Sequence, residues 1–246
     1  MVIPAKNEEN FLPKLLASLS MQDYLHSRPT KVYVADAGST DRTVEEALSF
    51  HDRLDITIIP GGLPSVARNN GARASQSTFI LFLDADIELK DPTLIRRAMR
   101  AMRGRQLHCA TVNIACTSTG LRDRILYSAS NLAQHLSTWL RPFGTGMFLL
   151  VDRARFEALG GFSELALFAE DYDFTRKISP LRFAIIRGEA HTSNRRFQKT
   201  GHLGMTWLFL KTMVNARNPG HFQKSHDYWT TRPEQPLTRR RYYSRG

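Results

Sequence analysis

Cysteine and long apolar runs are scarce in this chain of 246 residues. Its two cysteines, Cys109 and Cys116, form neither a CxxC zinc pattern nor a disulfide framework, which favours a reducing compartment. No uncharged apolar run approaches the roughly 18 residues of a membrane span. The first residues lead directly into polar ones, so we expect no signal peptide. These absences favour a cytoplasmic protein. If its C-terminal part docks on a membrane, we expect the protein at the inner face of that membrane.

Acidic residues are also in short supply, with 23 Asp and Glu against 34 Lys and Arg and a formal net charge of +11. Residues 187–246 hold 12 of the basic and 3 of the acidic residues, whereas the part before them is nearly neutral. Such a basic end suits a membrane surface, a nucleic acid or a phosphorylated substrate, and a solvated tail is the alternative. The interleaving of basic and aromatic residues that single-stranded nucleic acids require is poor before residue 187. We therefore expect no nucleic-acid partner.

Short apolar strands alternate with helical patterns along the body of the chain. We expect strands at 2–3, 31–36, 56–59, 79–83, 108–116, 144–151 and 182–187. We expect helices at 8–20 (capped by Asn7), 43–50, 65–75, 94–102, 122–140, 152–159, 170–178 and 203–216. This alternation predicts an α/β fold with a central, mostly parallel sheet flanked by helices. We expect one catalytic domain over 1–202, followed by a basic C-terminal helix and tail over 203–246.

Polar segments follow three of the expected strands, at 4–8, 36–41 and 84–86. Ligands of parallel α/β sheets bind beyond the carboxyl ends of the strands. We therefore expect these segments to meet at one rim and to form a binding site there.

Asp84-Ala85-Asp86 follows the apolar run Phe79–Leu83 directly. Two carboxylates one residue apart can offer oxygens to one Mg²⁺ or Mn²⁺ ion, which then shares its other positions with substrate phosphates. A solvated turn is the alternative, but charge beside a buried strand needs a partner or an exit to a cleft.

Two further segments carry candidate site residues. Asp36 ends a strand and could accept hydrogen bonds from a base or ribose, although a capping turn would also use such a segment. Arg68 lies near the start of a helix, where it could clamp a phosphate or simply face the solvent. Glu170 and Asp171 open an acidic helical turn, and one of them could act as a general base toward a hydroxyl.

Taken together, these segments resemble the family 2 glycosyltransferases of GT-A architecture. The matching stretches are VIPAKNEEN (2–10), VADAGSTD (34–41), ARNNGA (67–72), LFLDAD (81–86), GTGMFLLVDRARFEALGGF (144–162) and EDYDFTRK (170–177). They cover roughly residues 1–200 in the order of the family. The resemblance implies an α/β GT-A-like fold and a nucleotide-sugar donor. It also implies a divalent cation, Mn²⁺ or Mg²⁺, and an inverting transfer to an acceptor hydroxyl, with lipid-linked acceptors or cell-envelope glycan precursors as examples.

The resemblance also assigns roles to residues. On the donor side, Pro4, Lys6 and Glu8 would line the nucleotide pocket, Asp36 would contact the base, and Arg68 would lie near the donor. The turn Asp84-Ala85-Asp86 would hold the pyrophosphate through the metal, with Asp86 as the more direct ligand. Asp171 would be the catalytic base, and Glu170 would orient it or the acceptor.

The chain departs from the family pattern at two places. Ala37 stands where a second Asp is common, and the QxxRW pattern of processive synthases is absent, with HTSNRRF (191–197) in its place. This segment resembles a subset of small, non-processive members, in which Arg195 and Arg196 would lie near the diphosphate. His191 is a candidate metal ligand, and a hydrogen-bonded structural histidine is the alternative.

Other functions remain open from the sequence alone. A nucleotidyltransferase acting on a sugar phosphate would use the same acidic pair, and a basic binding protein for nucleic acids or anionic surfaces would use the charge. The segment 203–216, with Trp207 inside the basic end, could lie on an anionic bilayer as a peripheral contact or pack on the sheet.

Overall fold

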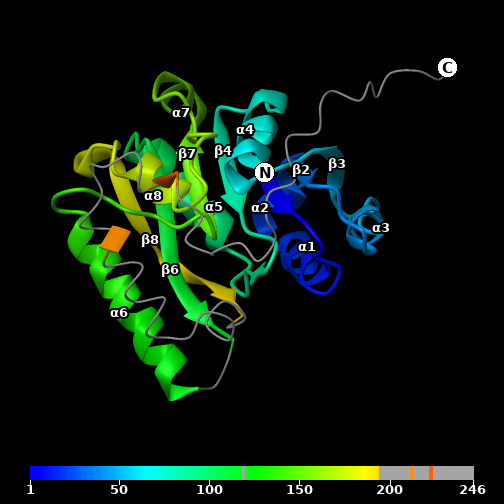
Figure 1. Cartoon of the computed structure of the whole chain (residues 1–246), viewed down its shortest axis with the longest axis horizontal. Coiled ribbons are helices and arrows are strands. Elements are labelled where there is room, and N and C mark those ends of the chain that lie inside the picture. Colours follow the sequence, from blue (N-terminus) through cyan, green and yellow to red (C-terminus); the bar gives the residue numbers. More distant parts are fainter. Residues whose placement is uncertain (118–119, 194–210, 213–221, 224–246) are drawn as a thin grey trace.

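The computed structural model describes residues 1–117, 120–193, 211–212 and 222–223 (Figure 1). Within these residues, eight strands form one sheet in the order β3-β2-β1-β4-β7-β6-β8-β5. The strands are β1 (Val2–Ala5), β2 (Lys31–Asp36), β3 (Asp55–Pro60), β4 (Phe79–Leu83), β5 (Ile87–Glu88), β6 (Cys109–Cys116), β7 (Phe148–Asp152) and β8 (Phe183–Thr192).

Helices cover both faces of this sheet. They are α1 (Leu12–Ser20), α2 (Asp23–Ser27), α3 (Thr43–Leu48), α4 (Pro64–Ala74), α5 (Leu94–Gly104), α6 (Leu121–Ser137), α7 (Arg153–Ala158) and α8 (Glu170–Thr175), with a 3₁₀ turn at Pro180–Arg182. Alternate residues of the strands point to opposite faces. Ile3 packs with α1, α3 and α5 in one core, and Val2 packs with α4, α7 and α8 in the other. The sheet is therefore buried on both sides, as its near-continuous apolar strands predicted.

Strand direction changes along the sheet. β1 is parallel to β2 and β4, β2 is parallel to β3, and β6 is parallel to β8. β7 runs antiparallel to both β4 and β6, and β5 runs antiparallel to β8. The expected mostly parallel α/β sheet is confirmed, and the reversed strands are an addition to it.

The sheet curls, because β5 follows β4 after only three residues and yet pairs with β8. Between β4 and β8 in the strand order lie β7 and β6. The chain can reach β8 from the end of β4 only if these strands bend back toward that end. The curl brings the C-terminal end of β8 beside the segment that follows β4.

The start of the first helix differs from the expectation. Asn7 does not cap a helix over 8–20, because α1 begins at Leu12. Asn7 instead adopts a φ of 55° and joins two loops: its amide N–H donates to Ser39 Oγ at 2.9 Å and its Oδ1 accepts from the Thr40 N–H at 2.9 Å. This arrangement ties the loop after β1 to the loop after β2.

The expected boundary at 202 and most of the expected helix 203–216 lie outside the described residues. Lys211 and Thr212 of that segment are described, and both are helical. Over the described part of the chain, no helix combines the length and the apolar character needed to cross a membrane.

Candidate functional site

The carboxyl ends of three neighbouring parallel strands form the rim of the site. β1 lies between β2 and β4, and Ala5 is in register with Asp36. Lys6 follows β1, Asp36 ends β2, and Asp84 follows β4. The expected convergence of three polar segments at one rim is therefore what this topology produces.

Arg68 on α4 is the centre of the polar contacts at this rim. Its side chain is 4% exposed, and its guanidinium donates to Asp84 Oδ1 at 2.6 Å and to Glu170 Oε1. Burial alone would lower its pKa, but the carboxylates of Asp84, Glu170 and Asp171 outweigh that effect and raise the pKa above its ordinary value. Arg68 thus joins the turn after β4 to the start of α8, and its charge is balanced by acids of the protein.

The position of Arg68 follows from how closely α4 lies on the sheet. A Cβ on Gly71, one turn further along α4, would come within 2.2 Å of Val2 Cγ1 on β1. Asn69 fixes the facing loop: its Nδ2 donates to the Phe162 carbonyl at 2.8 Å and its Oδ1 accepts from the Phe162 N–H at 3.0 Å. The Phe162 ring then lies 5.6 Å from the guanidinium carbon of Arg68, within cation–π range.

Gly146, in the loop before β7, closes the other side of Arg68. A Cβ at this position would lie 2.2 Å from Arg68 Nη2. The Gly146 N–H donates to Asp171 Oδ2 at 2.7 Å, and the Tyr172 N–H donates to Asp171 Oδ1 at 2.7 Å. The loop therefore shapes the guanidinium site and aims the carboxylate of Asp171 at the same time.

Asp171 has the electrostatic character of a base. Burial and the neighbouring Glu170 carboxylate raise the pKa of Asp171 to about 6, against the opposing effects of Arg68 and of the two backbone N–H donors. A carboxylate with a pKa near 6 is ionised at neutral pH and accepts a proton more readily than an ordinary Asp. Glu170 and Asp171, which the sequence predicted as a pair, lie side by side at the start of α8.

Asp84 and Asp86 supply oxygen donors at the end of β4. The side chain of Asp84 is 13% exposed, Asp86 is 6% exposed, and Ala85 between them is buried. Carboxylate oxygens are the ligands that Mg²⁺ and Mn²⁺ prefer, and such ions commonly leave several positions to substrate phosphates and water. Across the described residues, no three His, Cys, Asp or Glu side chains gather as a metal group. The chain could thus hold a cation through this pair, with the remaining ligands supplied from outside.

The other predicted donor residues lie along the rim with local partners. Asp36 is half-buried, and its carboxylate accepts from the Gly38 N–H, the Ser39 N–H and, at 2.5 Å, Ser39 Oγ. Lys6 is exposed, Pro4 lies in β1 opposite Ala35, and the Glu8 N–H donates to a threonine hydroxyl at 2.7 Å. Asp36 therefore shapes its own turn, and its role toward a base stays a prediction.

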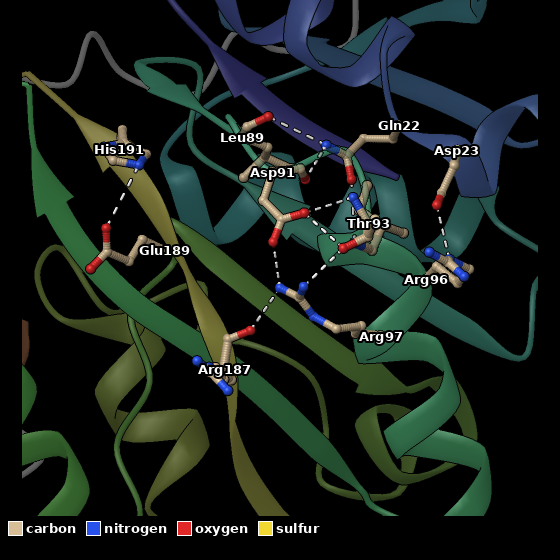
Figure 2. A network of polar contacts seen from close by, with 11 residues as sticks. Gln22, Asp23, Leu89, Asp91, Thr93, Arg96, Arg97, Arg187, Glu189 and His191 are labelled. Carbon is tan, nitrogen blue, oxygen red and sulfur yellow. Dashed lines mark hydrogen bonds and ion pairs between the residues drawn. The ribbon is translucent and has the colours of Figure 1, made fainter.

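His191 lies on β8, in register with Glu88 of β5. Its Nε2 is 3.8 Å from Glu189 Oε2, and Figure 2 shows the two side chains facing each other. Burial and Lys90 lower the pKa of His191, against the effects of Glu189 and Glu88. Among the described residues, His191 is not part of any group of three His, Cys, Asp or Glu side chains that could hold a metal ion. Arg195 and Arg196 lie outside the described residues, and their predicted roles stay predictions.

A polar clamp that the sequence did not predict holds β8 close to the segment between β5 and α5 (Figure 2). Arg97 Nη2 donates to Asp91 Oδ2 at 2.6 Å and to the Arg187 carbonyl at 2.8 Å, and its Nη1 donates to Thr93 Oγ1 at 2.8 Å. The buried Gln22 donates to the Leu89 and Asp91 carbonyls. The clamp fixes the segment that begins at β5, directly after Asp86. Asp91 and Thr93 lie within six residues of Arg97, but the Arg187 carbonyl is 90 residues away, and no local motif indicates that contact.

Phe222 is a second residue near the site that the sequence did not predict. Its ring stacks on Tyr172 with centroids 6.4 Å apart, and the Leu167 N–H donates to its carbonyl at 2.8 Å. Because Tyr172 follows Asp171 directly, Phe222 packs against the helix that carries the candidate base. An aromatic residue in a polar stretch near the end of the sequence was the available signal.

Comparison with known proteins places this geometry in a family. The model of the family described as glycosyl transferase family 2 matches residues 1–160. The chain belongs to glycosyl transferase family 2. A curated relative, the 4,4'-diaponeurosporenoate glycosyltransferase of Staphylococcus haemolyticus, is 26% identical over 193 residues. The match covers 76% of this chain and 48% of that protein, so the chain spans about half the length of this family 2 relative.

Solved structures of glycosyltransferases share the fold. The mannosyltransferase PcManGT from Pyrobaculum calidifontis, in complex with GDP-Man and Mn²⁺, has a TM-score of 0.66 and 19% identity, covering 92% of this chain and 67% of its own. TarS 1–349 of S. aureus, in complex with UDP-GlcNAc, has a TM-score of 0.60 and 19% identity, covering 78% and 57%. The expected GT-A-like fold of this family 2 member is therefore confirmed.

Proposed function

We propose that this chain transfers a sugar from a nucleotide-sugar donor to an acceptor hydroxyl, with a divalent cation and with inversion at the anomeric carbon. The observation that carries the proposal is Asp171, whose pKa is raised to about 6 and whose two oxygens are aimed by the backbone N–H groups of Gly146 and Tyr172. Arg68 links Asp171's neighbour Glu170 to Asp84, the first acid of the candidate cation turn. The nucleotide sugars and Mn²⁺ in the solved relatives support this assignment.

The proposed chemistry needs a proton acceptor and a stabilised leaving group. As the acceptor oxygen bonds to the anomeric carbon, its proton passes to a carboxylate oxygen of Asp171. The bond between that carbon and the diphosphate oxygen breaks, and the nucleoside diphosphate leaves with the electron pair. Attack on the face opposite the leaving group inverts the carbon.

The residues around Asp171 would bind the cation, position the acids and set the pKa of Asp171. Asp84 and Asp86 would hold the divalent cation, which would offset the negative charge of the departing diphosphate. Arg68 keeps Glu170 and Asp84 in place and holds down the pKa of Asp171, so that this carboxylate is ionised at neutral pH. Glu170 raises the proton affinity of Asp171 through its own charge.

Product analysis tests this proposal. The purified protein, Mn²⁺ and a panel of UDP- and GDP-sugars should release nucleoside diphosphate. In a parallel assay with nucleoside triphosphates and sugar 1-phosphates, a nucleotidyltransferase would release pyrophosphate. Asp171→Asn should lower the transfer rate by about 10²- to 10⁴-fold, the usual worth of a general base, while donor binding persists. The matched control is Asp173→Asn on the same helix, whose carboxylate pairs with Arg176 and Lys177. Full activity in Asp171→Asn, or pyrophosphate as the product, would overturn the proposal.

A further inference from the structure

Helix α6 carries its apolar side chains on the outside of the molecule. Leu121, Ile125, Leu132 and Leu136 are each more than half exposed, and the following Trp139 and Leu140 are 84% and 83% exposed. The spacing of the helical members, four, seven and four residues, places them along one stripe. Large apolar side chains that are exposed together, rather than singly, mark an interaction site.

Polar residues of α6 face inward, and the edge of β6 explains why. β7 pairs with β6 only over 109–111, so among the described residues no strand pairs with the backbone of β6 beyond Thr111 on that side. Asn131 supplies the missing partner: its Oδ1 accepts from the Ile114 N–H and its Nδ2 donates to the Ile114 carbonyl, both at 2.9 Å. Gln134 is buried and donates to the Val112 carbonyl. The helix thus attaches to the sheet by hydrogen bonds, which leaves its apolar stripe outside.

The apolar surface continues past the end of α6. A groove of about 500 Å³ is lined by Trp139, Thr138, Leu181, Phe183 and the basic Arg105, among others. Leu181 is 87% exposed. We call Leu132, Leu136, Trp139, Leu140 and Leu181 the α6 apolar surface.

Basic side chains lie near both ends of α6. Arg122 and Arg124 are exposed near the start of α6, and Arg105 and Arg141 are exposed near its end. The single acidic residue between 121 and 141, Asp123, is 5% exposed. An apolar stripe flanked by cations is complementary to a partner that has an apolar interior and anionic groups at its surface.

We propose that the α6 apolar surface docks on an anionic phospholipid bilayer, with Trp139 and Leu140 inserted and the arginines at the headgroups. A helix with an apolar face, cationic flanks and a Trp lies in the plane of such an interface. A second copy of the chain fits less well, because each copy carries a net charge of +11. The loop after α6 leads to Gly146, which contacts Asp171, so docking would bring this part of the candidate site near the membrane. The docking itself does not depend on the proposed reaction.

Vesicle co-sedimentation tests this proposal on the full chain. With equimolar POPG and POPC the protein should pellet with the vesicles, with POPC alone binding should fall at least tenfold, and added salt should weaken it. Trp139→Ser with Leu140→Ser should lower binding to the anionic vesicles at least tenfold. Met21→Ser is the matched control, because Met21 is 68% exposed and directly follows α1, and α1 and α6 lie apart in the molecule (Figure 1). Both changed residues are on the surface, so circular dichroism and the Tm should stay close to those of the parent protein.

A fluorescence measurement separates the membrane from other occupants. The chain has three tryptophans, and replacing Trp207 and Trp229 by Phe leaves Trp139 as the reporter. Trp139 should be quenched by acrylamide in the free protein and, after vesicles are added, by brominated lipid instead. Shielding of Trp139 before vesicles are added would mean that another part of this chain covers the surface and would overturn the proposal. A dimer in light scattering that is lost in Trp139→Ser with Leu140→Ser, with no vesicle binding, would overturn it as well.

Discussion

At the scale of the residue, Asp171 combines burial, a like charge beside it and an opposing cation. Its pKa is raised to about 6 because burial and Glu170 disfavour the ionised form more than Arg68 and two N–H donors favour it. A base must be ionised to act, so activity is present above this pKa and is lost as pH falls through it. We expect kcat/KM to decline with a slope of one below about pH 6.

Replacing Arg68 tests whether Asp171 is the group that produces this pH dependence. Because its guanidinium lowers the pKa of Asp171, Arg68→Met should shift the acid limb to higher pH. The matched control is Arg73→Met on the same helix, because Arg73 is 62% exposed and pairs with Glu164. A limb that stays in place in Arg68→Met, or one that shifts equally in both variants, would mean that Asp171 does not produce it.

At the scale of the element, the loop before β7 depends on the absence of a side chain at one position. A Cβ on Gly146 would lie 2.2 Å from Arg68 Nη2 and 2.8 Å from its Cζ. Gly146→Ala should therefore displace the guanidinium from two buried carboxylates and lower stability by about 3–5 kcal/mol, the usual cost of breaking a buried ion pair. Urea unfolding measures this loss, and transfer activity should fall with it.

Gly104→Ala is the matched control for this change. Gly104 ends α5, and a Cβ built there meets nothing within 4 Å. Alanine is the better helix former by about 1 kcal/mol in helix interiors, so stability should stay equal or rise slightly. Equal losses in the two variants would contradict the steric account of Gly146.

The Arg97 clamp belongs to the same scale, since it holds one strand against another. Arg97→Met would leave the Arg187 carbonyl and Asp91 without this donor, and we expect a loss of about 1–2 kcal/mol with faster hydrogen exchange at the β5–β8 pair. Arg96→Met is the matched control, because Arg96 is next to Arg97 on α5 and forms a half-exposed ion pair with Asp23 of α2. Unchanged exchange at Ile87 and Thr192 in Arg97→Met would show that the clamp does not position this part of the sheet.

Local sequence patterns predicted where the helices and strands lie better than they predicted whether neighbouring strands run parallel or antiparallel. The apolar run at β4 and the turn chemistry after β1 and β2 identified the parallel half of the sheet and its polar rim. The sequence of β7, FLLVD, is a run of apolar residues that fits a buried strand of either direction, so its antiparallel pairing with β4 was not predictable. β5 has two residues and is a strand only because the sheet curls β8 against it.

The candidate site shows the same limit. Asp84, Glu170 and Asp171 were predicted from acidic spacing after a strand and at a helix start. The ion pairs of Arg68 with Asp84 and Glu170 span 16 and 102 residues, and no local pattern encodes them. Arg68 was therefore predicted near a phosphate, whereas its guanidinium is held between two acids of the protein.

At the scale of the whole molecule, the proposed function requires a site that binds a nucleoside diphosphate together with a cation. A ligand that binds only the folded protein at 100 times its Kd adds about 2.7 kcal/mol of stability. For a chain of this size that corresponds to a rise in Tm of roughly 5–10 °C. We expect UDP or GDP with Mn²⁺ to produce such a rise, and the same nucleotide without metal to produce much less.

The carboxylates after β4 account for the metal-dependent part of this shift. Asp86→Asn should remove most of the rise in Tm that Mn²⁺ adds to that of the nucleotide. The Tm of the ligand-free variant should stay close to that of the ligand-free parent protein. Asp91→Asn is the matched control further along the same segment, because its carboxylate binds Thr93 and Arg97 rather than facing the rim. A shift with Mn²⁺ that survives in Asp86→Asn would place the cation elsewhere in the chain. A shift of the same size with and without Mn²⁺ in the parent protein would instead mean that the nucleotide binds through protein groups alone.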